Sequence, residues 1–402
     1  MIAQFKPSFL SGKVDAPPSK SMAHRLLIGA ALSGKVCTLS GVDYSEDILA
    51  SMECLEALGA KITKNEDRVT VDPCGFMQSE NPILKCRESG STLRFFIPLA
   101  LCLKRPVTLL GSQRLLERPL GVYEDLCREK EFQFSKNNDS ISVCGNLASG
   151  HYQIPGNVSS QFISGLIFAL VYQNKASSIQ ILPPFESKPY IHLTIAALKF
   201  FGADINFSDE YNIVIQPSEF HSYSGKIEGD YSNAAFLDAF NQIGSKIQIE
   251  NLNPQSLQGD KIYKAYFNEL AKGMPVLDLS DCPDLGPVLF AVAALKNGAV
   301  FTGTNRLKAK ESDRGSAMQE ELQKLGGNLV IKDNQITVPK QILNDQGILL
   351  SGHNDHRIVM ALSVILSRIG GSIDGAEAIK KSYPGFFDDM KKLGAEVTFY
   401  DR

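Results

Sequence analysis

A pattern that recurs every 70 residues restricts the fold of this 402-residue chain more than any other feature. Small polar clusters stand directly before apolar runs at six places, which begin at Ser19, Ser89, Ser159, Asp230, Asp284 and Asn354. The first three clusters are spaced 70 residues apart, and so are the last two. Because a fixed period is typical of repeated supersecondary units, the pattern predicts about six βα-type units, three in each half of the chain.

A second pattern follows the first and supports an α/β fold. An apolar helical stretch ends in glycine, and a strand-like segment follows it, at residues 55–62, 198–205, 322–329 and 390–397. Glycine suits these joints because it adopts the left-handed conformation that closes a helix at little cost. A fifth copy, residues 126–134, lacks the glycine. Such joints occur in any α/β protein, but two patterns with one period favour true repeats, with a seam near residues 226–230.

The composition excludes several classes of protein. The formal net charge is −3, so no overall positive field would attract nucleic acid. No apolar run reaches the roughly 18 residues of a membrane span, and the N-terminus lacks the apolar core of a secretion signal. The eight cysteines form no C-x-x-C pair, which disfavours a zinc site and favours reduced thiols in the cytoplasm. We therefore expect a soluble globular protein of two or three domains.

The predicted helix starts have the properties of anion-binding sites. A helix N-terminus offers free backbone N–H groups and a partial positive charge. The starts at Ser19, Ser89 and Ser159 have serines and no acidic residue in the first predicted turn, although ordinary helices favour acids there. Routine capping by serine is the alternative for each start, but three starts in register favour binding of external anions.

Cationic side chains stand near these starts and at other element boundaries, namely Lys20, Arg25, Arg118, Lys310, Arg314, Arg357 and Lys381. Ser21 and Arg25 have the i,i+4 spacing that places two residues on one helix face, and Lys310 and Arg314 repeat it. Each cation alone could be a solvated surface charge. In βα units, however, such boundaries gather at one end of the sheet, where ligands bind. P-loop, dinucleotide-binding and zinc-protease motifs are absent, which disfavours those classes of site. From the cations and the helix starts together, we expect an enzyme that binds two small phosphorylated anions.

Five segments together resemble the signature blocks of one enzyme family, the 3-phosphoshikimate 1-carboxyvinyltransferases or EPSP synthases. They are residues 18–25, 158–162, 187–190, 310–314 and 354–357. The resemblance implies an α/β fold of two similar domains, each with three βαβαββ-like repeats, and an active site in the interdomain cleft. It further implies that residues 20–228 form one domain and residues 1–19 plus 229–402 the other. The crossovers would lie near residues 19–20 and 228–230.

The reaction implied by this resemblance transfers the enolpyruvyl group of phosphoenolpyruvate to the 5-hydroxyl of shikimate 3-phosphate and releases phosphate, in chorismate and aromatic amino acid biosynthesis. By matching motif positions, phosphoenolpyruvate would be bound by Lys20, Gly90, Ser91, Arg118, Gln161, Arg314, Arg357 and Lys381. Shikimate 3-phosphate would be bound by Lys20, Ser21, Arg25, Ser159, Ser160, Gln161, Ser187, Tyr190, Asp284 and Lys310. The resemblance implies no cofactor, no metal and no macromolecular partner, and a monomer is expected.

The addition–elimination chemistry of the family needs an acid, a base and cations. The implied catalytic residues are Asp284, Glu311, Lys20 and His356. Asp284 would take the hydroxyl proton, Glu311 would shuttle the proton at the methylene carbon, and Lys20 would assist the leaving phosphate. The alternatives are that Asp284 only caps the following helix and that Glu311 only forms an i,i+3 surface pair with Arg314.

Two positions depart from the family pattern. The segment Glu88-Ser89-Gly90-Ser91 replaces the usual Asn-x-Gly-Thr, so a carboxylate would repel phosphoenolpyruvate unless it turns away or pairs with a cation such as Arg94. Arg306 stands where many members have an uncharged polar or acidic residue. Two other functions stay open at this point: enolpyruvyl transfer to UDP-N-acetylglucosamine, and non-catalytic binding of phosphorylated ligands by an inactive paralogue.

Overall fold

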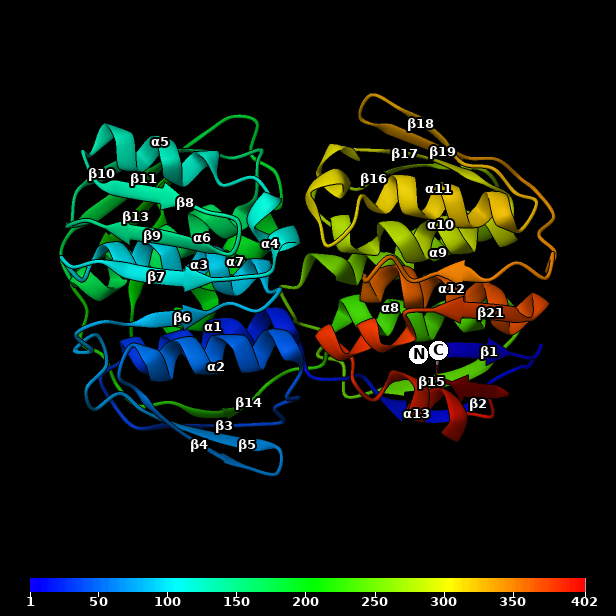
Figure 1. The fold of residues 1–402 in the computed structure, drawn as a ribbon, viewed down its shortest axis with the longest axis horizontal. Coiled ribbons are helices and arrows are strands. Elements are labelled where there is room, and N and C mark those ends of the chain that lie inside the picture. The colour runs from blue at the N-terminus through cyan, green and yellow to red at the C-terminus, as the bar shows by residue number, and fades with distance from the viewer. Residues whose placement is uncertain (402) are drawn as a thin grey trace. The chain divides into compact units, whose positions relative to one another are not determined.

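The computed structural model describes residues 1–401, which form two compact units (Figure 1). The central unit is Pro18–Glu228, and the terminal unit combines Met1–Pro17 with Gly229–Arg402. Each unit has its own hydrophobic core. Among residues 1–401, no helix combines the length and the apolar character that crossing a membrane requires.

The central unit contains three four-stranded sheets of the same design. In each sheet two strands run parallel, and a third and a fourth strand follow antiparallel. The sheet orders are β14-β3-β5-β4, β6-β7-β9-β8 and β10-β11-β13-β12. The strands are β3 (Cys37–Ser40), β4 (Lys61–Asn65), β5 (Arg68–Asp72), β6 (Ile83–Lys85), β7 (Val107–Leu110), β8 (Gln133–Lys136), β9 (Ser140–Cys144), β10 (His151–Pro155), β11 (Ser177–Leu182), β12 (Asp204–Phe207), β13 (Asn212–Gln216) and β14 (Ser224–Lys226).

The helices of the central unit complete three repeats. They are α1 (Lys20–Leu32), α2 (Glu46–Ala57), α3 (Gly90–Leu101), α4 (Gln113–Glu117), α5 (Gly121–Glu129), α6 (Ser160–Gln173) and α7 (Lys188–Lys199). Apart from the short α4, the second and third repeats run β-α-β-α-β-β along the chain, as the family resemblance implies. Helices α1, α3 and α6 are buried over most of their length, which is why their sequences are apolar on nearly all sides.

The terminal unit repeats this design with one reduction. Its sheets have the orders β15-β2, β16-β17-β19-β18 and β20-β21-β1-β22, so the first has two strands instead of four. The N-terminal strand β1 pairs with both β21 and β22, strands from the other end of the chain (Figure 1). The strands are β1 (Ile2–Phe5), β2 (Ser11–Asp15), β15 (Lys246–Glu250), β16 (Val276–Asp278), β17 (Ala299–Thr302), β18 (Val330–Lys332), β19 (Gln335–Val338), β20 (Leu350–Ser351), β21 (Gly371–Asp374) and β22 (Val397–Tyr400).

Helices and 3₁₀ turns connect these strands. The helices are α8 (Tyr231–Gln242), α9 (Tyr263–Lys272), α10 (Gly286–Leu295), α11 (Arg314–Lys324), α12 (His356–Ile369) and α13 (Phe386–Lys392). The 3₁₀ turns are η1 (Gly259–Ile262), η2 (Pro283–Leu285), η3 (Asn305–Ala309) and η4 (Ala376–Lys381). The prediction of six repeated units, three in each half, is confirmed by the six small sheets, although the β15-β2 sheet lacks the final antiparallel pair.

The helix–glycine–strand joints are also confirmed. Gly59, Gly202, Gly326 and Gly394 have φ angles between 78° and 104°, which is the left-handed region expected after a helix. In the copy without glycine, Glu131 occupies the equivalent place after α5 and has a φ of 55°. The backbone therefore keeps the same turn even though a non-glycine residue is disfavoured there.

Candidate active site

Serine caps begin the three long helices of the central unit, as the 70-residue spacing predicts. Ser19, Ser89 and Ser159 are the N-cap residues of α1, α3 and α6, and each hydroxyl accepts a hydrogen bond from a backbone N–H of the first turn. No acidic residue lies in any of these first turns. These serines therefore do cap their helices, and anion binding at the helix starts stays a prediction. A capping hydroxyl still has its own hydrogen to donate, so capping and anion binding are compatible.

Lys20 stands at the start of α1 and is held by a carboxylate that the sequence did not indicate. Its ammonium lies 2.6 Å from Asp47 Oδ2, near the start of α2. Both side chains are mostly buried, with 15% and 8% of their surface exposed. A buried pair of this kind fixes the position of the cation. Asp47 is 27 residues away in sequence, and an acid in the first turn of a helix is too common to mark a partner.

Four residues expected at phosphoenolpyruvate lie close together in the central unit. Gln161 Nε2 donates to Ser91 Oγ at 2.9 Å, which joins the starts of α6 and α3. A Cβ atom on Gly90 would lie 2.5 Å from a guanidinium nitrogen of Arg118, so only glycine lets this arginine approach the α3 backbone. Gly90 and Ser91 lie in the first turn of α3, as the predicted helix start at Ser89 requires.

A second group in the central unit surrounds Arg25, which is buried. Its Nη1 donates to the Ser21 carbonyl at 2.6 Å, which confirms that the two residues share a helix face. Its Nε donates to Thr194 Oγ1 at 2.8 Å and its Nη2 to the Tyr190 carbonyl at 3.2 Å. Burial lowers the pKa of Arg25 to about 10, so the guanidinium remains charged at neutral pH.

The other residues expected at shikimate 3-phosphate stand at helix starts of the same unit. Ser187 is the N-cap residue of α7 and has a left-handed φ of 55°. Tyr190 lies in the first turn of α7, and Ser160 is the first residue of α6. Ser160 and Ser187 are both buried.

In the terminal unit, Arg314 is the centre of an ion-pair cluster. It begins α11 and only 1% of its side chain is exposed. Its guanidinium contacts Asp284 at 2.7 Å, Glu311 at 2.8 Å and Asp355 at 2.9 Å, each through a different nitrogen. These three carboxylates raise the pKa of Arg314 against the effect of burial. The sequence predicted the cation but not that three acids would surround it.

Asp284 lies in the 3₁₀ turn η2 before α10 and does not cap that helix, which has no side-chain cap. Its carboxylate instead contacts Lys310 Nζ at 2.9 Å as well as Arg314. Burial would raise the pKa of Asp284, but the charges of Lys310, Arg314 and Arg357 outweigh it and hold that pKa well below its usual range. The capping alternative for Asp284 is therefore wrong.

Lys310 lies just before α11, so the i,i+4 spacing to Arg314 does not fall within one helix. Burial, together with Arg314 and Arg306, lowers its pKa to about 8, against the opposite effect of Asp284. Glu311 does form the i,i+3 pair with Arg314, but at 15% exposure it is not a surface pair. The alternative for Glu311 is thus correct about the pair and wrong about its exposure.

The start of α12 brings further expected residues to the same unit. Asp355 caps the helix by accepting from the Arg357 N–H at 2.8 Å. His356 is the first helical residue and is buried. Arg357 Nη1 donates to Asn233 Oδ1, near the start of α8, at 3.0 Å. Lys381 Nζ donates to the Asn354 carbonyl at 2.5 Å.

The structure shows the surroundings of Glu88 and Arg306, the two residues that depart from the family pattern. Arg94, which we considered as a partner of Glu88, donates to Gln161 Oε1 at 2.7 Å and to the Pro119 carbonyl at 3.1 Å. Glu88 lines a surface pocket together with Arg87. Arg306 Nη1 donates to the Ser280 carbonyl at 3.4 Å, and the Arg306 charge contributes to the lowered pKa of Lys310.

Four contributing residues were not predicted as part of the site, although Arg94 was named as a possible partner of Glu88. Asp355 lies inside segment 354–357, one of the five that carry the family resemblance, so its position next to His356 and Arg357 was a usable signal. Asp47, Arg94 and Asn233 act through contacts to residues 27, 67 and 124 positions away. No local pattern marks such partners.

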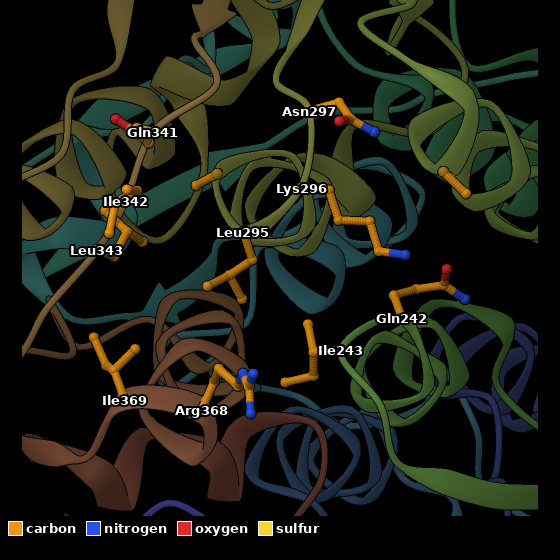
Figure 2. Close-up of a pocket in the computed structure, with 12 residues that line it drawn as sticks. Gln242, Ile243, Leu295, Lys296, Asn297, Gln341, Ile342, Leu343, Arg368 and Ile369 are labelled. Carbon is orange, nitrogen blue, oxygen red and sulfur yellow. The ribbon is translucent and has the colours of Figure 1, made fainter.

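One open pocket of the terminal unit does not contain these residues. It has a volume of about 670 Å³ and lies where α8, α10 and α12 end (Figure 2). Figure 2 shows Gln242, Lys296 and Arg368 around it, together with apolar side chains such as Ile243. The expected site residues stand at the starts of these helices, so this pocket is not the predicted substrate site.

One group among residues 1–401 has the side-chain types of a metal site. Ligand atoms of Glu320, Glu321 and His353 lie within 4.8 Å of one another. Lys324 already pairs with both carboxylates, at 3.0 Å and 2.9 Å. A bound cation would have to displace this ammonium, so the group fits an internal ion-pair network better than a metal.

Comparison with known proteins identifies the relationship. The family model described as EPSP synthase (3-phosphoshikimate 1-carboxyvinyltransferase) matches residues 5–390. The 3-phosphoshikimate 1-carboxyvinyltransferase of Clostridium kluyveri is 37% identical, over 97% of both chains. That of Clostridioides difficile is 35% identical, also over 97% of both chains.

A solved structure supports the fold. The EPSP synthase of Acinetobacter baumannii matches with a TM-score of 0.77 and 21% sequence identity, over 99% of this chain and 100% of that one. At this identity the likeness concerns the fold alone. The family match and the relatives that align over nearly the full length show that the chain belongs to the EPSP synthase family.

Proposed function

We infer that the chain catalyses transfer of the enolpyruvyl group of phosphoenolpyruvate to the 5-hydroxyl of shikimate 3-phosphate, with release of phosphate. The observation that carries this conclusion is the 37% identity to a 3-phosphoshikimate 1-carboxyvinyltransferase over 97% of both chains. An inactive paralogue would have lost acid–base residues, yet Lys20, Asp284, Glu311 and His356 are all present.

The charges of the two units suit this pair of substrates. Each substrate has one carboxylate and one phosphate, so several fixed cations are needed to bind both. In the terminal unit, Lys310, Arg357 and Lys381 are proposed to supply them. Arg314 has five N–H donors, and its short contacts to carboxylates use three of them. We propose that a remaining donor binds phosphoenolpyruvate without breaking the cluster.

The central unit would supply the remaining contacts. We assign Gly90, Ser91, Arg118 and Gln161 to phosphoenolpyruvate, because the Gln161–Ser91 contact and the approach of Arg118 to Gly90 join them into one group. The Arg25 group, with Ser21 and Tyr190, and the serine helix starts are assigned to shikimate 3-phosphate. Helix N-termini and buried cations both favour its anionic groups.

The reaction proceeds by addition and elimination. A proton adds to the methylene carbon of phosphoenolpyruvate, which makes C2 electrophilic. The 5-hydroxyl oxygen then bonds to C2 while its proton passes to a base. The tetrahedral ketal loses a methyl proton, and phosphate departs with the electrons of its C–O bond, which leaves the enol ether.

Asp284 is the proposed base for the hydroxyl proton. Its lowered pKa means that it is ionised, and therefore able to accept a proton, at neutral pH. So low a pKa also makes a weak base. Binding of two anionic substrates would oppose the charges of Lys310, Arg314 and Arg357, so the pKa of Asp284 should rise in the ternary complex.

Glu311 and Lys20 take the remaining proposed roles. Glu311 is nearly buried beside Arg314, which places a carboxylate within a cationic site where it could exchange the proton at the methyl carbon. Lys20 is held by Asp47 and would stabilise negative charge on the departing phosphate. His356, buried at the α12 start, is proposed to act beside them.

We also propose that the enzyme works as a monomer in the cytoplasm. All eight cysteines are free thiols, and six of them are buried. This supports a reducing compartment. Size-exclusion chromatography with light scattering would test the monomer, since a stable dimer would double the mass.

A direct test of catalysis is to follow phosphoenolpyruvate and shikimate 3-phosphate with the enzyme by ³¹P NMR. We expect the phosphoenolpyruvate signal to decline as inorganic phosphate and a phosphorylated enol ether accumulate in equal amounts. Substrates that bind the protein but remain unreacted would support the non-catalytic alternative instead.

A further inference from the structure

Glu321 in α11 is a completely buried carboxylate with three hydrogen-bond donors around it. Its side chain is 0% exposed. Its oxygens accept from the Ser351 N–H at 2.9 Å and from Lys324 Nζ at 2.9 Å, and one lies 2.6 Å from His353 Nε2. Burial would raise the pKa of Glu321, but these contacts outweigh it and lower that pKa, so the group is ionised at neutral pH.

Two of these donors belong to a short turn, residues 351–355, which connects β20 to α12. His353 and Asn354 have φ angles of 49° and 50°, so two successive non-glycine residues are left-handed. Such residues cost free energy and persist only where the surroundings fix them. Inside the turn, the His353 N–H donates to Ser351 Oγ at 3.1 Å. The Glu321 carboxylate lies outside the turn and contacts two of its residues, Ser351 and His353.

The far end of the same turn holds the cations assigned to phosphoenolpyruvate. The Asn354 carbonyl accepts from Lys381 Nζ at 2.5 Å. Asp355 pairs with Arg314 at 2.9 Å and caps α12 directly before Arg357. The direction of the Asn354 carbonyl is set by the left-handed backbone, so the place of Lys381 depends on the turn.

Helix α11 therefore contacts the turn at two points. Arg314, in its first turn, binds Asp355, and Glu321 binds Ser351 and His353. Glu321 follows Arg314 by seven positions, which is about two helical turns, so both side chains leave the same face of α11. The two contacts fix the position and the orientation of the turn relative to this helix.

We propose that Glu321 is a positioning residue for phosphoenolpyruvate binding, acting through His353 and Ser351 on the turn that orients Lys381 and Arg357. This inference rests on the proposed function of those two cations. Glu321 itself does not reach the substrate. It sets the geometry of the groups that do, and a displacement of about 1 Å in such groups can change rates on the order of a hundredfold.

Two variants and one matched control test the proposal in the full-length enzyme. Glu321→Gln keeps the size of the side chain but sets an amide N–H₂ against one of the three donors. His353→Gly retains a backbone suited to positive φ and removes the link to Glu321. Glu320→Gln is the control, because it removes a carboxylate charge from the same group, whereas Glu320 is 57% exposed and its ion pair is with Lys324.

For each protein, KM for phosphoenolpyruvate, KM for shikimate 3-phosphate and the thermal unfolding midpoint would be measured, with calorimetry for shikimate 3-phosphate binding alone. We expect KM for phosphoenolpyruvate to rise about tenfold or more in both variants. The affinity for shikimate 3-phosphate should stay within about twofold, and the control should resemble the wild type throughout.

Three results would overturn the proposal. An unchanged KM for phosphoenolpyruvate in folded Glu321→Gln and His353→Gly would show that the turn needs no such anchor. An equal loss of affinity for both substrates would show general damage to the fold. A wild type that releases no phosphate from the two substrates would contradict the proposed function, and this inference with it, whereas an active wild type with unaffected variants contradicts only the inference.

Discussion

Lys310 should control the alkaline limit of activity. Its pKa is about 8 compared with an ordinary value of 10.5, because burial and the charges of Arg314 and Arg306 act together against the influence of Asp284. With a pKa of about 8, roughly nine-tenths of the enzyme has a charged Lys310 at pH 7 and about one-tenth at pH 9. If the charge binds shikimate 3-phosphate, kcat/KM for that substrate should fall with a midpoint near pH 8.

Arg306→Asn is the perturbation that tests this cause. The repulsion between the charges of Arg306 and Lys310, at such a partly buried site, is on the order of 1 kcal/mol at an effective dielectric constant of about 20. Since about 1.4 kcal/mol corresponds to one pKa unit, the substitution should raise the pKa of Lys310 by roughly 0.5–1. The alkaline limit of kcat/KM should move upward by the same amount.

The assay is steady-state phosphate release from pH 6 to pH 10 at limiting shikimate 3-phosphate. Because kcat/KM reports groups of the free enzyme, its limit follows Lys310 before substrate binds. The limit of kcat should lie higher, since the bound anion favours the charged lysine. Lys308→Asn is the matched control: it removes one positive charge from the same 3₁₀ turn, but Lys308 is exposed and is not among the causes of the Lys310 shift.

Two results would refute the reasoning. A wild-type profile that is flat from pH 7 to pH 9.5 would show that the Lys310 charge is not required for productive binding. An Arg306→Asn profile that coincides with that of Lys308→Asn would show that Arg306 does not act on Lys310.

Three further predictions concern catalysis, the close approach of Arg118 and stability. Asp284→Ala should lower kcat by about 10²–10⁴ while calorimetry shows phosphoenolpyruvate still binding, and near-normal turnover would exclude Asp284 as the base. Gly90→Ala places a Cβ 2.5 Å from an Arg118 nitrogen, so KM for phosphoenolpyruvate should rise about tenfold or more, and an unchanged KM in steady-state assays would contradict this. Glu131→Gly relieves a left-handed φ of 55° and should raise the free energy of unfolding by roughly 0.5–1 kcal/mol, whereas a lower urea midpoint would be inconsistent with strain there.

Features set by neighbouring residues could be predicted from the sequence. Ser19, Ser89 and Ser159 begin their helices because each hydroxyl caps a backbone N–H two or three residues ahead. Such capping depends only on local chemistry. The glycine joints are local in the same sense, since one residue must adopt a left-handed φ.

The joint at Glu131 shows where this local reasoning fails. The repeat imposes the left-handed turn on Glu131 although nothing in the residue type favours it. The repeat outweighs the local preference, so this turn is located by its place in the repeat and not by a glycine.

The interior of the candidate site depends on contacts between distant residues, which the sequence did not reveal. Arg314 was expected to bind substrate, but its carboxylate partner Asp355 lies 41 residues away. The Glu321–His353 contact spans 32 residues. Motif positions supplied the residues that meet the substrates. Which acids hold those cations in place follows only from the fold.

The central claim is that this enzyme transfers the enolpyruvyl group specifically to shikimate 3-phosphate, and phosphate release with two acceptors tests it most directly. The enzyme would be incubated with phosphoenolpyruvate and either shikimate 3-phosphate or UDP-N-acetylglucosamine, and inorganic phosphate would be measured over time. We predict release of one phosphate per shikimate 3-phosphate consumed and none above background with the nucleotide sugar. Release with UDP-N-acetylglucosamine alone would contradict the assignment.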